Sequence, residues 1–192
     1  MVATVAVGSN ESTPRPRWAL LAVPVLALSA CAGDAGTTTT ADPASACDFT
    51  GTTETPEVEA VGGPFQIAEV RHEIARPGCE ERIVFTFESL PDGAELGYRV
   101  FYRDSPFVGP AGEIEVAGDA LLEVVLFEAS AGELEPQPES EAELVIDIVQ
   151  PPEVPGGSLW LIGLEQQLPF AVAVDETPEP VLTVSIGAPD DS

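Results

Sequence analysis

The stretch Arg82-Ile83-Val84-Phe85-Thr86-Phe87 alternates its side chains with a period of two. Ile83, Phe85 and Phe87 would share one face of a strand, and the three intervening residues would share the other. This alternation predicts a half-buried β-strand, because the apolar residues of a helix recur every three or four positions.

Comparable segments lie on the C-terminal side of this strand. In Leu159–Leu164 both faces are apolar, as expected of a central strand, and in Glu143–Val149 the inner face should carry Leu144, Ile146 and Ile148. The other expected strands are Tyr98–Tyr102, Ala120–Phe127, Phe170–Val174 and Val181–Ile186.

No segment after Phe65 has a sustained helical period, and turn residues such as Pro91-Asp92-Gly93 separate the strands. The acidic stretch 132–143 is interpreted as a long surface loop. The sequence therefore predicts an all-β domain, a compact antiparallel β-sandwich or open barrel of seven to nine short strands.

The N-terminal region has the pattern of a lipoprotein signal. Two arginines precede an apolar run that ends in Leu28-Ser29-Ala30-Cys31, so residues 1–30 are expected to be cleaved and Cys31 to carry the lipid. The run is too short for a transmembrane helix, which needs about 20 residues. An ordinary signal peptide cut near Ala30 or Ala32 is the alternative.

Four segments follow from these patterns. They are the signal peptide 1–30, a flexible tether 31–64 rich in Thr, Pro and Glu, the β domain 65–188 and a tail 189–192. The tether has no helical or strand period and little apolar surface to bury. The expected location is extracytoplasmic, on the outer face of the cell membrane, through a lipid on Cys31.

The chain is strongly acidic, with seven basic and 33 acidic residues and a formal net charge of −26. All seven basic residues are arginines. Such a balance excludes nucleic acid as a partner, because binding to a polyanion relies on basic side chains that release counterions. It also disfavours direct docking on anionic lipid.

Cys47 and Cys79 are left as a pair once Cys31 is lipidated. Because disulfides persist outside the cytoplasm, we expect these two to be bridged. Two free thiols, or a metal pair, remain as alternatives.

The sequence offers little for catalysis or for a cofactor. His72 is the only histidine and no Gly-x-Ser-x-Gly motif occurs, so neither a serine triad nor a zinc hydrolase is favoured. We expect no enzyme activity, no metal, no cofactor, and a half-exposed His72 at a strand end. An acidic metal-dependent enzyme would require carboxylates that converge in a pocket.

A binding surface is the better prospect. Arg99 and Arg103 share a strand face by parity, with Phe101 between them, and arginine and aromatic side chains suit carboxylates and sugar rings. In the alternative interpretation the arginines pair with the chain's own carboxylates and the aromatic residues fill the core. The candidate ligand-binding residues are Tyr98, Arg99, Tyr102, Arg103 and Trp160.

Several strings, in this order, resemble the AMIN-like domain of actinobacterial secreted proteins and lipoproteins. They are Val70-Arg71-His72, Glu81 to Phe87, Gly97-Tyr98-Arg99-Val100, Val116 to Leu121, Leu159 to Leu164 and Pro169 to Val172. The resemblance spans roughly residues 65–186. It departs from the family between Arg71 and Arg82, where Pro77, Gly78 and Cys79 replace the usual loop.

The resemblance implies a β-sandwich of the cell envelope with no established catalytic residues. We expect a non-catalytic lipoprotein whose domain binds peptidoglycan or a wall-associated component. The alternative is a protein-interaction module that docks a secreted or membrane-bound envelope protein through a sheet edge.

Overall fold

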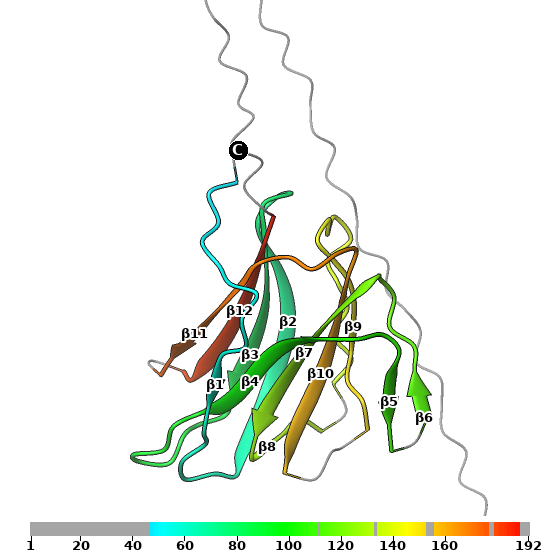
Figure 1. Ribbon diagram of the computed structural model, residues 1–192. Helices are drawn as coiled ribbons and strands as arrows, with labels where there is room; N and C mark the ends of the chain where they lie inside the picture. Colours follow the sequence, from blue (N-terminus) through cyan, green and yellow to red (C-terminus); the bar gives the residue numbers. More distant parts are fainter. Residues whose placement is uncertain (1–46, 111, 133, 153–155, 177–178, 189–192) are drawn as a thin grey trace, which may run out of the picture. The chain divides into compact units, whose positions relative to one another are not determined.

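The computed structural model describes residues 47–188 apart from 111, 133, 153–155 and 177–178 (Figure 1). Within these residues it has twelve strands and no helix, and eight of the strands have five or more residues, which confirms the predicted all-β class. The strands are β1 (Glu57–Val58), β2 (Phe65–Arg76), β3 (Glu80–Phe87), β4 (Gly97–Arg103), β5 (Phe107–Gly109), β6 (Gly112–Ile114), β7 (Ala120–Phe127), β8 (Ala129–Ser130), β9 (Val145–Val149), β10 (Gly157–Leu164), β11 (Phe170–Asp175) and β12 (Val181–Gly187). No helix of the described part is long and apolar enough to cross a bilayer.

Two five-stranded sheets form a β-sandwich. One has the strand order β1-β4-β7-β10-β9 and the other β11-β12-β3-β2-β8, and Figure 1 shows them as two layers. All strand pairs are antiparallel except β2 with β8, which is parallel. The short hairpin of β5 and β6 is separate from both sheets.

The main core lies between the two sheets, and β3 supplies the face predicted from its alternation. Ile83, Phe85 and Phe87 are buried there. Phe85 meets Trp160 of the opposite sheet edge to face, with ring centroids 5.6 Å apart. Burial of these rings is the main stabilising term, since each large side chain contributes about 1.5–3 kcal/mol when fully buried.

The central strand β10 is apolar on both faces for a structural reason. Trp160 and Ile162 point into the main core, whereas Leu159 and Leu161 pack on the outer face of their sheet against Phe107 of the β5–β6 hairpin. The prediction of a central strand is confirmed, because β10 lies between β7 and β9.

The prediction that Ile146 lies on the inner face of residues 143–149 is wrong. The register between β9 and β10 shifts, because Gly163 pairs with Asp147 and Leu164 with Val145. Ile146 is thus the extra residue of a β-bulge, and its side chain is 40% exposed. A bulge interrupts the period of two, so simple alternation fails across it.

The folded domain begins before residue 65, within the segment predicted as a tether. Thr52 forms a bridge with Phe170, and β1 pairs with β4. The Phe49 ring lies so close to Gly187 that a Cβ at this glycine would collide with it. Residues 47–64 are therefore part of the domain, whereas residues 31–46 of the tether, the signal peptide, Cys31 and the tail 189–192 lie outside the described residues.

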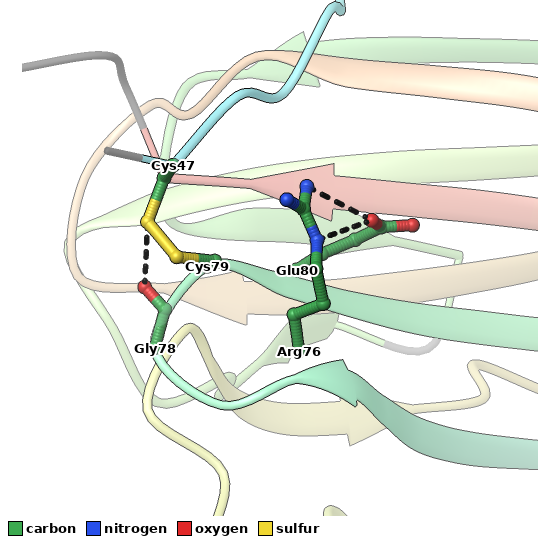
Figure 2. Close-up of a disulfide and its surroundings, with 5 residues drawn as sticks. All are labelled: Cys47, Arg76, Gly78, Cys79 and Glu80. Carbon is green, nitrogen blue, oxygen red and sulfur yellow. Dashed lines mark hydrogen bonds and ion pairs between the residues drawn. A yellow bond between two sulfur atoms is a disulfide. The ribbon is translucent and has the colours of Figure 1, made fainter. Parts of the chain in front are cut away.

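Figure 2 shows the predicted disulfide between Cys47 and Cys79, which is present. Cys79 lies at the turn between β2 and β3, so the bridge attaches the start of the described chain to this turn. Beside it, burial of Glu80 raises its pKa, but ion pairs with Arg82 and Arg76 outweigh burial and lower the pKa overall. Glu80 is therefore held ionised at neutral pH.

Removal of the disulfide by Cys47→Ser with Cys79→Ser is expected to lower the free energy of unfolding by about 3–4 kcal/mol, because the bridge closes a long loop in the unfolded chain. The sequence separation of 32 residues sets this magnitude. Urea denaturation of the double variant and the oxidised wild-type chain measures the difference. A change below about 1 kcal/mol would contradict a structural role for the bridge.

Candidate functional site

The outer face of β4 carries a row of three side chains. Arg99 and Arg103 flank Phe101, and their guanidinium carbons lie 4.8 and 5.5 Å from the centroid of its ring. Such cation–π contacts hold a guanidinium group in place while its N–H groups stay available to a ligand. The row confirms the strand parity predicted for Arg99 and Arg103, and we call these three residues the β4 row.

At one end of the β4 row, the charge of Arg103 is neutralised by a carboxylate of the same domain. Arg103 forms an ion pair with Glu123 of β7, whose side chain is only 4% exposed, and a hydrogen bond of 3.2 Å joins Arg103 Nη2 to Glu123 Oε1. The guanidinium also lies 5.2 Å from the Phe107 ring centroid. Because an unpaired buried carboxylate is costly, this arginine is committed to Glu123.

At the other end of the β4 row, Arg99 is only weakly paired. Among the residues that the structure describes, Arg99 has a single ion-pair contact, to Glu57 of β1 at 4.0 Å, and both side chains are partly exposed. An exposed pair at that distance contributes well under 1 kcal/mol. In the described part of the chain, Arg99 Nε is buried without a hydrogen-bond partner. Arg99 is thus the member of the row best able to bind an external carboxylate.

The structure separates the two tyrosines from this row. Tyr98 and Tyr102 pack against the main core from the opposite face of β4. The Tyr102 hydroxyl donates to the Leu168 carbonyl at 2.6 Å and accepts from the Leu168 N–H at 2.8 Å. Burial raises the pKa of Tyr102, against a smaller lowering by the Leu168 hydrogen bond. Tyr102 therefore acts as a structural link between β4 and the segment before β11.

Trp160 does not belong to a surface site. Its exposed fraction is 0%, and its ring packs on Phe85 in the core. Of the five predicted ligand-binding residues, only Arg99 and Arg103 lie on the outer face of the sheet. Phe101 joins them there, and it could have been found from its position between the two arginines.

His72 is buried within β2, so the prediction of a half-exposed strand-end residue is wrong. The register between β2 and β3 shifts between Ile67 and Glu69, and after this shift Val70 and His72 point inward. His72 Nε2 lies 3.0 Å from Glu81 Oε2, and both side chains are 0% exposed. The reasoning from sequence missed this buried pair, since neither residue type predicts burial by itself.

The His72–Glu81 pair fastens the acidic loop 132–143 to the sandwich. Glu139 N–H donates to His72 Nδ1 at 2.8 Å, so this nitrogen carries no proton and Nε2–H donates to Glu81. Glu81 also accepts three backbone hydrogen bonds of 2.6–2.9 Å, from the N–H groups of Glu143, Leu144 and Val145. The described residues of the loop form no strand, in line with the prediction of a loop, and hydrogen bonds to both His72 and Glu81 hold it on the sandwich.

This buried pair has the chemistry of a structural clamp. Both Glu81 oxygens and both His72 nitrogens have hydrogen-bond partners in the protein, and within the described part of the chain none of these partners is a hydroxyl or a thiol. Among the described residues, no group of three His, Cys, Asp or Glu side chains is arranged to hold a metal ion.

Comparison with known protein families matches residues 66–187 to the AMIN-like domain. Comparisons with curated proteins and with solved structures found no match. The matched region runs from β2 to the end of β12, so it includes every strand of the two sheets except β1, together with the β4 row and the buried pair. The chain therefore belongs to the AMIN-like domain family, which indicates an extracytoplasmic module of the cell envelope.

Proposed function

We propose that this chain is a non-catalytic envelope lipoprotein whose domain binds peptidoglycan or a wall-associated component through the β4 row. A lipid on Cys31 would hold it at the outer face of the membrane, and the residues before Cys47 would set its reach. The weakly paired, half-exposed Arg99 is the observation that carries this proposal. Family membership supports an envelope role of this kind.

The chemistry of the row defines the ligand. The Arg99 guanidinium group lies over Phe101 and is only weakly paired with Glu57, so this end of the row presents planar N–H donors next to an apolar ring. Planar donors of this type bind carboxylates in pairs, and wall peptides carry free carboxylates beside sugars. In a chain with a net charge of −26, general electrostatic attraction cannot supply this affinity, so the binding must be local.

Arg99→Ala is expected to weaken binding to intact cell-wall sacculi about 10- to 100-fold, because a hydrogen-bonded charge contact contributes about 1.5–3 kcal/mol. Co-sedimentation of the full chain with sacculi over a concentration series measures this loss. The variant should keep a melting temperature close to that of the wild-type chain, since the contacts of Arg99 with Glu57 and with the Phe101 ring are both partly exposed and weak.

Arg71→Ala is the matched control. Arg71 is also a half-exposed arginine on a β-strand, but it belongs to the other sheet and pairs with Glu69 and Glu73. It should sediment with sacculi as the wild-type chain does. An equal loss of sedimentation in both variants would mean that the effect comes from the change in net charge alone. Unchanged sedimentation of Arg99→Ala would overturn the proposal.

A further inference from the structure

The edge strand β11 has backbone groups that face away from its sheet. At its start, Thr52 N–H donates to Phe170 O at 2.8 Å and Phe170 N–H donates to Thr52 O at 2.9 Å. The polar groups of Phe170 therefore point away from β12. Because alternate residues of a strand direct these groups to the same side, those of Val172 and Val174 also point outward.

No described residue pairs with Val172 or Val174 on that side, since β11 pairs with β12 and, at Phe170 alone, with Thr52. Such an open edge is normally blocked by charges, proline or a bulge. β11 has an unbroken register with β12 over six residue pairs, and its sequence Phe170-Ala-Val-Ala-Val-Asp175 has one charge, at its end.

The opposite edge of the sandwich shows what a blocked edge looks like. In β9 a bulge interrupts the register. There Asp147 accepts hydrogen bonds from the N–H groups of Ala117 and Ile148, at 3.0 and 2.9 Å. β11 has no bulge, and its one charged residue lies at its end, so it can accept a further strand.

The side chains of β11 suit an apolar strand. Val172 and Val174 are partly buried and pack against the main core, whereas Ala173 points outward and is exposed. A strand added beside β11 would extend the core with its own alternate apolar residues, and the small Ala173 offers no steric barrier on the other face.

The end of β11 favours a basic partner. A surface cleft adjoins the turn after Asp175, and its lining includes five carboxylates and no basic side chain: Glu88, Asp92, Glu95, Glu176 and Glu179. A second copy of this chain, with a net charge of −26, would bring further negative charge to this cleft. A segment with basic residues would be attracted to it.

We propose that β11 is a docking edge for an extended segment of a partner protein, in which basic residues precede an alternating apolar strand. Antiparallel pairing with Val172 and Val174 would place the basic residues at the Asp175 end, beside the cleft. This edge belongs to the other sheet from the β4 row, so the proposal stands independently of wall binding.

The test uses the full chain and a fluorescein-labelled peptide of two arginines followed by alternating threonine and valine. Saturable binding, measured by fluorescence anisotropy, is expected. Val174→Pro should weaken binding at least 10-fold, because proline removes an outward N–H without breaking a bond to β12. Val174→Thr, which keeps the N–H and the side-chain shape, should bind as the wild-type chain does. The peptide with N-methylated valines should not bind.

Thermal unfolding of Val174→Pro checks that this variant folds. If it does not fold, Ala173→Arg tests the same edge, because an arginine at this exposed position should weaken binding by repelling the basic peptide. Arg99→Ala should bind the peptide normally, which separates this proposal from wall binding. The proposal would be overturned if Val174→Pro or Ala173→Arg, once shown to be folded, bound the peptide as tightly as the wild-type chain does. It would also be overturned if the wild-type chain showed no saturable binding up to about 1 mM. A dimer of the chain that Val174→Pro abolishes, seen in sedimentation velocity, would also overturn it by identifying a second copy as the occupant.

Discussion

Glu81→Ala is expected to lower the free energy of unfolding by about 3–5 kcal/mol, because it leaves buried donors without an acceptor. The carboxylate accepts from three consecutive backbone N–H groups and from His72, and its side chain is 0% exposed. Urea denaturation measures the loss. Amide hydrogen exchange at Glu143, Leu144 and Val145 should accelerate in the variant, because these are the donors that lose their acceptor.

The matched control is Glu73→Ala, which removes a half-exposed carboxylate of the neighbouring strand. It should change stability by no more than about 0.5 kcal/mol, as most surface substitutions do. Glu81→Gln keeps one acceptor oxygen but adds two donors that have no acceptor nearby, so it should fall between the alanine variant and the wild-type chain. A Glu81→Ala variant as stable as the control would mean that loop 132–143 does not depend on this clamp.

Trp160→Ala is expected to lower the free energy of unfolding by about 3–5 kcal/mol, since it empties the largest side-chain volume of the core. Trp160 contacts Phe85 across the two sheets and is fully buried. Thermal or urea unfolding measures this. Trp160→Phe should cost much less, because it keeps an aromatic ring and removes an indole N–H that has no partner among the described residues.

Val108→Ala controls for the loss of an apolar side chain at the surface. Val108 is 67% exposed on β5, so its truncation should leave stability within about 0.5 kcal/mol of wild type. The same Trp160 variants also test the earlier assignment of this residue to a binding surface. Because the Trp160 side chain is buried, Trp160→Ala should lose sedimentation with sacculi only to the extent that the variant unfolds.

Most of the strands could be predicted because their evidence is local. Residues 120–127 were expected as a strand and form β7 with the same bounds, and the alternation of β3 gave its buried face correctly. The errors lie at register shifts. Ile146 is the extra residue of the β9 bulge, and His72 follows a shift in β2. A bulge depends on the partner strand, so no pattern within one strand reveals it.

The candidate site was predicted only in part. The parity of one strand was enough to place Arg99 and Arg103 together, whereas Trp160 was taken as a candidate although both faces of its strand were predicted to be apolar. A strand buried on two sides exposes neither of its faces, so the chemical character of an aromatic residue there does not indicate ligand binding. Residues 47–64 were misassigned for a similar reason, because they pair with β4 and β11 through single bridges and a two-residue strand.

The sequence by itself predicted the all-β class, the strand periods, a disulfide between Cys47 and Cys79 and the common face of Arg99 and Arg103. Each of these follows from neighbouring residues or from a count of cysteines. Only the tertiary structure decided that Trp160 is core, that Glu81 and His72 clamp a loop, and that β11 is an open edge. These properties arise from contacts between residues far apart in the chain, and burial and strand order are set by the packing of the two sheets.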